Sequence, residues 1–124
     1  MKKSIHLTNQ SVAYMAARAP EGDINFSSSI NAAIEQLAHI ARAEMPTLDD
    51  AEFAELCTVY AGSDLNRIAL PLNIAADLLM HYGAAVPSQL PKETAALVER
   101  LARLTQAEQF AIIDAVRVFW HAQE

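Results

Sequence analysis

The stretch Ser4-Ile5-His6-Leu7-Thr8, close to the N-terminus, decides which fold the sequence predicts. Ile5 and Leu7 alternate with polar residues, and strand side chains alternate between two faces, so the stretch predicts a short β-strand with one apolar face. Nothing later in the sequence shows the alternation and β-branched enrichment of a second strand. We therefore expect the strand to pair with the same strand of a second copy.

Two helical patterns separated by a proline-glycine break follow this strand. Thr8 is the predicted N-cap of a first helix over about residues 9–19, because its hydroxyl can accept a hydrogen bond from a free backbone N–H. Ala19-Pro20-Glu21-Gly22-Asp23 ends that helix, since proline has no N–H to donate. A second helix is predicted to begin within Phe26-Ser27-Ser28-Ser29-Ile30. Its apolar residues keep helical spacing: Ile30, Ala33, Ile34, Leu37, Ile40 and Ala41.

This order of strand, helix, turn and helix, over about residues 2–45, resembles the ribbon-helix-helix superfamily, which includes the Arc and MetJ repressors and the ParD-like antitoxins. The ParD-like branch is the most similar, through Ser29-Ile30, Ile34-Glu35, Leu37-Ala38 and Ile40-Ala41-Arg42-Ala43. The resemblance implies a homodimer, or a higher even oligomer, whose paired strands enter the major groove of double-stranded DNA. It also implies a dimer core made of Ile5, Leu7, Ile30, Ile34 and Leu37.

The same resemblance assigns the DNA contacts. The outward strand residues Ser4, His6 and Thr8 would read bases, with Lys2 and Lys3 beside them on the DNA backbone. The serines that open the second helix, Ser27, Ser28 and Ser29, would hold a phosphate. An independent physical reason supports this role, because free N–H groups and the helix dipole favour an anion at a helix N-terminus.

Beyond residue 45 the sequence predicts helices throughout. One opens in Pro46-Thr47-Leu48-Asp49-Asp50 and runs to Gly62, and another runs from Ser63-Asp64 to Tyr82-Gly83, with a kink or break just before Pro71. After a connector over 84–91, a third covers 92–104, and the capping box Thr105-Gln106-Ala107-Glu108 starts the last. We expect a mainly α protein with one N-terminal strand: a ribbon-helix-helix module (1–45), then a helical domain (46–124) that forms a bundle or packs on a partner.

Composition limits the classes of function. The 124 residues are 52% hydrophobic, which suits one compact domain or two small ones, and the net charge is −6. Residues 1–45 hold four basic and four acidic residues, whereas the rest holds five basic and eleven acidic. All the net acidity thus lies outside the predicted DNA-binding module. The acidic helices are either a solvated surface or a binding site for a basic partner protein, such as a toxin.

Chemistry-bearing residues are sparse. Cys57, the single cysteine, is a predicted core residue and excludes an intrachain disulfide. We expect a soluble, cytoplasmic protein, because neither a signal-peptide pattern nor a membrane-spanning apolar window is present. The glycines do not form a phosphate-binding loop, no serine lies in a nucleophile-elbow motif, and the histidines lack metal-ligand spacing: His6, His39, His81 and His121. We expect no cofactor, no metal and no enzymatic activity.

Two function classes follow. The first is a DNA-binding transcriptional repressor, which could also be the antitoxin of a toxin-antitoxin pair. The second is an all-helical adaptor or inhibitor that binds another protein without contacting DNA; the segment 4–8 would then be an edge strand or an extended tail. Phe119 and Trp120 either close the core or form a partner-binding face, since aromatic residues are enriched at binding hot spots.

Overall fold

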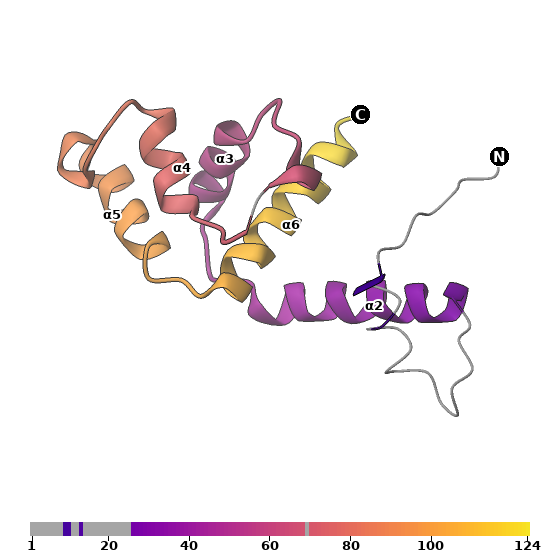
Figure 1. Ribbon diagram of the computed structural model, residues 1–124. Coiled ribbons are helices and arrows are strands. Elements are labelled where there is room, and N and C mark those ends of the chain that lie inside the picture. The colour runs from indigo at the N-terminus through magenta and orange to yellow at the C-terminus, as the bar shows by residue number, and fades with distance from the viewer. Residues whose placement is uncertain (1–8, 11–12, 14–25, 69) are drawn as a thin grey trace. The chain divides into compact units, whose positions relative to one another are not determined.

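The computed structural model describes residues 9–10, 13, 26–68 and 70–124 (Figure 1). These residues are mainly helical, as predicted, and none of them lies in a strand. The predicted strand 4–8 falls outside them. The helices are α2 (Phe26–Glu44), α3 (Asp50–Val59), α4 (Ile74–His81), α5 (Lys92–Leu101) and α6 (Gln106–Ala122), with one-turn 3-10 helices η2 (Leu65–Arg67) and η3 (Pro87–Gln89). Among the described helices, none is both long and apolar enough to cross a membrane.

Residue contacts divide the chain into two compact units, Met1–His39 and Ile40–Glu124, with the division inside α2. In the second unit α3 packs against both α6 and α4, and α4 packs against α5 (Figure 1). Their apolar sides meet in one core, whose fully buried side chains come from all four helices: Leu56, Ile74, Leu78, Leu97, Val98, Leu101, Ile112 and Val116. The domain boundary at residues 45 and 46 stays a prediction.

Two helices of this unit begin with a capping box. The Asp49 carboxylate accepts a hydrogen bond from the Glu52 N–H (2.7 Å), and the Glu52 carboxylate accepts one from the Asp49 N–H (3.0 Å). At the start of α6, Thr105 Oγ1 and Glu108 Oε1 make the same reciprocal pair, at 3.1 and 3.0 Å. The predicted box at 105–108 is confirmed. Each pair satisfies N–H groups that the first helical turn leaves without a partner.

The helix predicted to start at Ser63-Asp64 is wrong in its first half. The chain makes only the single turn η2 there. Ile68 and the described residues 70–73, which include the cis Leu70–Pro71 bond, are not helical, and α4 begins at Ile74. Proline cannot donate a backbone hydrogen bond and clashes with the preceding turn, so the expected break near Pro71 is confirmed. Asn73 caps the helix that follows, with its Oδ1 accepting from the Ala76 N–H at 3.1 Å.

Two glutamines of α6 hold this non-helical segment in place. Gln106 Oε1 accepts from the Leu72 N–H (2.6 Å) while Gln106 Nε2 donates to the Leu72 carbonyl (2.8 Å). The buried Gln109 accepts from the Ile74 N–H at 3.0 Å and donates to the Leu104 carbonyl at 3.2 Å. Because both ends of each amide are satisfied, burying Gln109 leaves no polar group without a partner. The start of α4 is thereby fixed on α6.

The C-terminal aromatic residues have different roles. Trp120 packs on the core, and its indole Nε1 donates to the Cys57 carbonyl at 2.9 Å. Cys57 itself is buried, as predicted, and burial raises the pKa of its thiol. Phe119 contacts Phe53 and Trp120 edge to face yet is 38% exposed, and the neighbouring Val118 is 62% exposed. Core closure therefore accounts for Trp120, whereas Val118 and Phe119 leave an apolar surface on α6.

Candidate dimerisation and nucleic-acid interface

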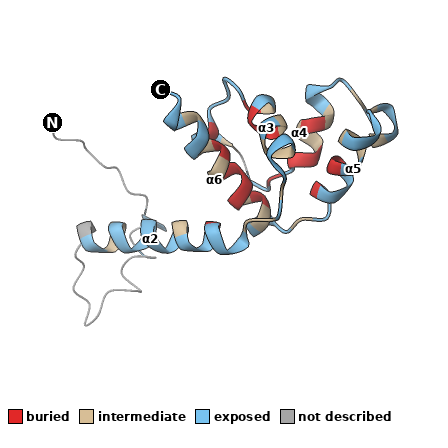
Figure 2. Ribbon diagram, turned by 180° about the vertical axis from the view of Figure 1, so that it is seen from behind, coloured by how far each residue is buried: buried red, intermediate tan, exposed pale blue. Residues whose placement is uncertain are grey.

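The described dimer-core residues predicted from the sequence lie on one side of α2, and we call Ile30, Ile34 and Leu37 the α2 apolar face. Residues three and four apart on a helix are neighbours, so these three form a stripe. Ile34 is 59% exposed and Leu37 is 47% exposed, while Ile30 is partly buried. Figure 2 shows most of α2 in the colour of exposed residues. Large contiguous apolar patches are a common feature of interaction sites on protein surfaces. Ile5 and Leu7 lie outside the described residues.

Among the described residues of α2, full burial occurs towards the C-terminal end of the helix. Ile40 is still exposed, but Ala41 is buried and Met45, just after the helix, packs against the core of the second unit. Arg42 in the last turn interacts favourably with the helix dipole. The apolar pattern of α2 therefore continues beyond the part of the helix that the second unit uses.

The serine run lies at the start of α2, as predicted. The helix begins at Phe26, so Ser27, Ser28 and Ser29 fall in its first turn, which holds no acidic residue. Ser28 is exposed and Ser29 is partly buried. The helix dipole favours an anion at this end of the helix. Contact with a phosphate stays a prediction. The other predicted DNA contacts lie outside the described residues: Lys2, Lys3, Ser4, His6 and Thr8.

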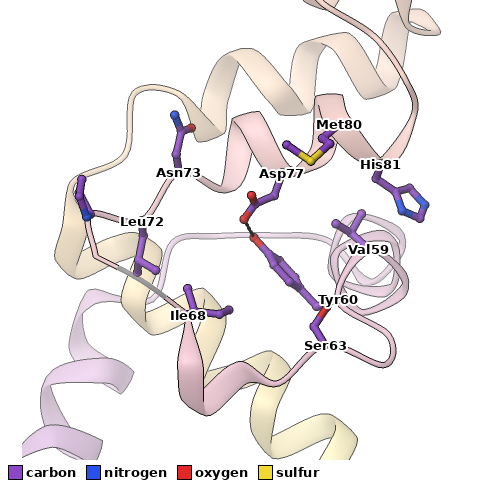
Figure 3. A pocket seen from close by; sticks show the side chains of 10 residues that line it. Val59, Tyr60, Ser63, Ile68, Leu72, Asn73, Asp77, Met80 and His81 are labelled. Atoms are coloured by element: carbon purple, nitrogen blue, oxygen red, sulfur yellow. Dashed lines mark hydrogen bonds between the residues drawn. The ribbon is translucent and has the colours of Figure 1, made fainter.

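Sequence reasoning missed a tyrosine-carboxylate pair in the second unit. The Tyr60 hydroxyl donates a hydrogen bond to Asp77 Oδ2 at 2.5 Å, joining the end of α3 to α4 (Figure 3). Burial raises the pKa of Tyr60 far above its ordinary value, and the hydrogen bond and negative charge of Asp77 raise it further. Asp77 is an acidic residue in an otherwise apolar helical stretch, which is a usable signal. Its partner lies 17 residues away, which no local pattern shows.

Two carboxylates of α3, those of Glu52 and Glu55, make similar links between helices. Glu55 accepts a hydrogen bond from the Tyr82 hydroxyl at 2.6 Å, and this bond, followed by burial, raises the pKa of Tyr82. Glu52 pairs with Arg100 of α5, whose guanidinium also donates to the Thr47 carbonyl at 3.1 Å. These acidic groups thus connect α3 to its neighbours. Among the described residues, no group of histidine, cysteine and carboxylate side chains could hold a metal ion.

The chain matches no family model, no curated protein and no solved structure.

Proposed function

We propose that the protein is a sequence-specific DNA-binding transcriptional regulator that acts as a homodimer. Residues 1–45 would form a ribbon-helix-helix module, and residues 46–124 a helical domain for oligomerisation or partner binding. The observation that carries this proposal is the α2 apolar face with its exposed Ile34 and Leu37, on a helix whose first turn holds three serines and no acidic residue. In the dimer, this face and the apolar side of the strand 4–8 are buried, and the polar side of the strand contacts DNA.

Burial of the α2 apolar face is large enough to matter for association. Each large apolar side chain moved from water into a core contributes about 1.5–3 kcal/mol. Ile34 and Leu37 are about half exposed, and in a twofold-symmetric dimer every contact occurs twice, so burying their exposed parts contributes about 3–6 kcal/mol from both copies together. That sum lies at the lower end of the association cost of about 4–15 kcal/mol in lost translational and rotational freedom. Strand pairing and the residues Ile5 and Leu7 would add to it.

The first experiment measures binding of the purified full chain to the DNA immediately upstream of its own gene, at two salt concentrations, with the molar mass determined in parallel. We expect site-specific, salt-sensitive binding by a dimer or a higher even oligomer, because each phosphate contact releases counterions. A stable monomer without DNA affinity at low salt would overturn the proposal.

A matched pair of variants tests the α2 apolar face directly. Ile34→Asn with Leu37→Asn should convert the protein to a monomer and abolish DNA binding. Glu35→Asn with Gln36→Asn changes two exposed residues on other sides of the helix, at a similar cost in helix propensity, and should leave both properties unchanged. If the first variant remains dimeric and binds DNA as the wild type does, the α2 apolar face is not the interface.

The predicted strand is tested separately. Substituting Lys2, Lys3 and His6 together by alanine should remove specific DNA binding while the oligomer survives, since these residues are assigned to the DNA side of the ribbon. Loss of the oligomer together with DNA binding would assign them to the dimer core instead.

A second candidate is a helical adaptor or inhibitor that binds a basic protein, such as a toxin, without contacting DNA. The exposed Val118 and Phe119 on α6 favour it, because they belong to the part of the chain that carries the net negative charge. Val118→Ser with Phe119→Ser should then abolish partner binding, and the triple alanine variant at Lys2, Lys3 and His6 should leave it untouched. If the protein is instead a DNA-binding regulator, the triple alanine variant should lose DNA binding and the Val118→Ser, Phe119→Ser variant should keep it.

A further inference from the structure

A cleft of about 530 Å³ opens in the second unit between the end of α3, the non-helical segment before α4, and α4 itself (Figure 3). Its volume lies within the range of about 300–1,000 Å³ typical of small-molecule sites. The apolar part of the lining includes Val59, Ile68, Leu72 and Met80. The Asp77 carboxylate belongs to the same lining and lies within this largely apolar surface.

The electrostatics of the cleft favour a positively charged ligand. Of the described residues that line it, Asp77 is the one carboxylate, His81 is the one basic side chain, and none is lysine or arginine. Tyr60 is neutral at pH 7, as a tyrosine with its ordinary pKa is, and burial and the neighbouring Asp77 raise its pKa further. Its single hydroxyl proton is already donated to Asp77 Oδ2. Among the described residues, the structure gives the other oxygen, Oδ1, no hydrogen-bond donor.

The wall of the cleft is fixed before any ligand arrives. Gln106 holds both backbone groups of Leu72, Gln109 holds the N–H of Ile74, and Asn73 caps α4. Tyr60 is 5% exposed, so its hydroxyl holds Asp77 from a rigid position. Preorganisation of this kind lowers the entropic cost of binding. A polar group held at the edge of an apolar cleft orients a ligand with one charged end.

We propose that this cleft binds a small organic cation, namely a primary or secondary ammonium group on a short apolar body. The ammonium donates a hydrogen bond to Asp77 Oδ1, and the apolar body packs against Ile68, Leu72 and Met80. The site lies entirely within the second unit and does not depend on DNA binding. The competing explanation is that the Tyr60–Asp77 bond only joins α3 to α4.

The test uses the full-length protein with three probes of equal chain length: hexylamine, 1-hexanol and hexanoate. Calorimetry measures affinity, and NMR chemical-shift changes locate the binding site. We expect saturable binding of hexylamine with shift changes in the lining residues, about tenfold weaker binding of 1-hexanol, and none of hexanoate. A hydrogen bond to a charged group accounts for a difference of about tenfold or more.

Two matched variants complete the test. Asp77→Asn keeps the size of the side chain and an acceptor for the Tyr60 hydroxyl, and should weaken hexylamine binding about tenfold or more. Asp114→Asn removes a carboxylate of α6 that pairs with Arg117 outside the cleft lining, and should have no effect. Thermal unfolding verifies that both variants fold. If Asp77→Asn does not fold, the proposal is tested by the difference in affinity between hexylamine and 1-hexanol for the wild-type protein.

Three results would overturn the proposal: no saturable hexylamine binding, equal affinity for 1-hexanol and hexylamine, or unchanged affinity in folded Asp77→Asn. Any of them would leave the Tyr60–Asp77 bond as a link between two helices. None of them bears on DNA binding, which is measured separately.

Discussion

Helices α2 and α6 share an amphipathic pattern, but within the described part of the chain α6 buries most of its apolar residues, whereas α2 leaves most of its apolar residues exposed. Ile112 and Val116 of α6 are fully buried, whereas Ile34 and Leu37 of α2 are about half exposed. Helical periodicity determines which residues share a side, because it depends on backbone geometry alone. What covers that side depends on which other elements fold against it. Helix α6 is thus stabilised by packing within the chain, whereas Ile34 and Leu37 of α2 stay exposed to solvent.

The largest expected effect is in the core of the covered helix. Ile112→Ala should lower the free energy of unfolding by about 2–5 kcal/mol, because it leaves a cavity among fully buried neighbours. Urea denaturation measures this loss. Val118→Ala, on an exposed position of the same helix, is the control and should change stability by less than about 0.5 kcal/mol. Equal losses for the two variants would show that α6 is not packed as described.

The Tyr60–Asp77 bond is expected to contribute less. Tyr60→Phe should cost about 1.5–3 kcal/mol at pH 7, since it removes a hydrogen bond to a charged group. The pKa of folded Tyr60 is raised above its unfolded value, so the stabilisation is complete below about pH 10 and is lost as the pH rises from there through the folded pKa.

Chemical denaturation at several pH values checks this prediction. The gap in stability between the wild type and Tyr60→Phe should narrow above about pH 10. Tyr82→Phe removes a more exposed hydroxyl bonded to Glu55 and should have a smaller effect at pH 7. A gap that widens with pH would contradict the burial of Tyr60.

The N-cap of α6 should contribute less to stability than the Tyr60–Asp77 bond. Thr105→Ala removes the side chain that accepts the Glu108 N–H and should destabilise the protein by about 1 kcal/mol. Thermal unfolding by circular dichroism measures the change. Thr47→Ala, in the exposed connection between α2 and α3, should be close to neutral. An unchanged melting temperature in Thr105→Ala would mean that tertiary packing alone positions the start of α6.

The smallest effect is predicted for the uncovered helix. At the lowest usable protein concentration, Leu37→Ala should change the stability of the monomer by less than about 0.5 kcal/mol. At high protein concentration, formation of the proposed dimer stabilises the wild type by mass action, so Leu37→Ala should then be less stable than the wild type. A loss as large as that of Ile112→Ala at every concentration would show that Leu37 is buried within its own chain.

Much of the helical unit was predictable because the signals are local. The box at 105–108 marks the start of α6, the helical spacing around Cys57 placed that residue in the core, and Pro71 marked the break before α4. Gln109 offers a further signal, because an amide on the same stripe as Ile112 and Val116 must find polar partners when buried. Each of these signals depends on residues within about two helical turns of one another.

The remaining features depend on residues that are far apart in the sequence. The sequence predicted a helix at Ser63-Asp64, but the structure has one turn there and then a segment held by Gln106, more than thirty residues away. The cleft requires Tyr60 and Asp77 to meet across two helices. Backbone geometry and steric rules act over a few residues, so caps, breaks and apolar sides follow from local sequence. Tertiary packing decides which side of a helix is covered, which buried amide finds hydrogen-bond partners and where a cleft opens. The contact energies that decide these features exist only once segments distant in the sequence meet.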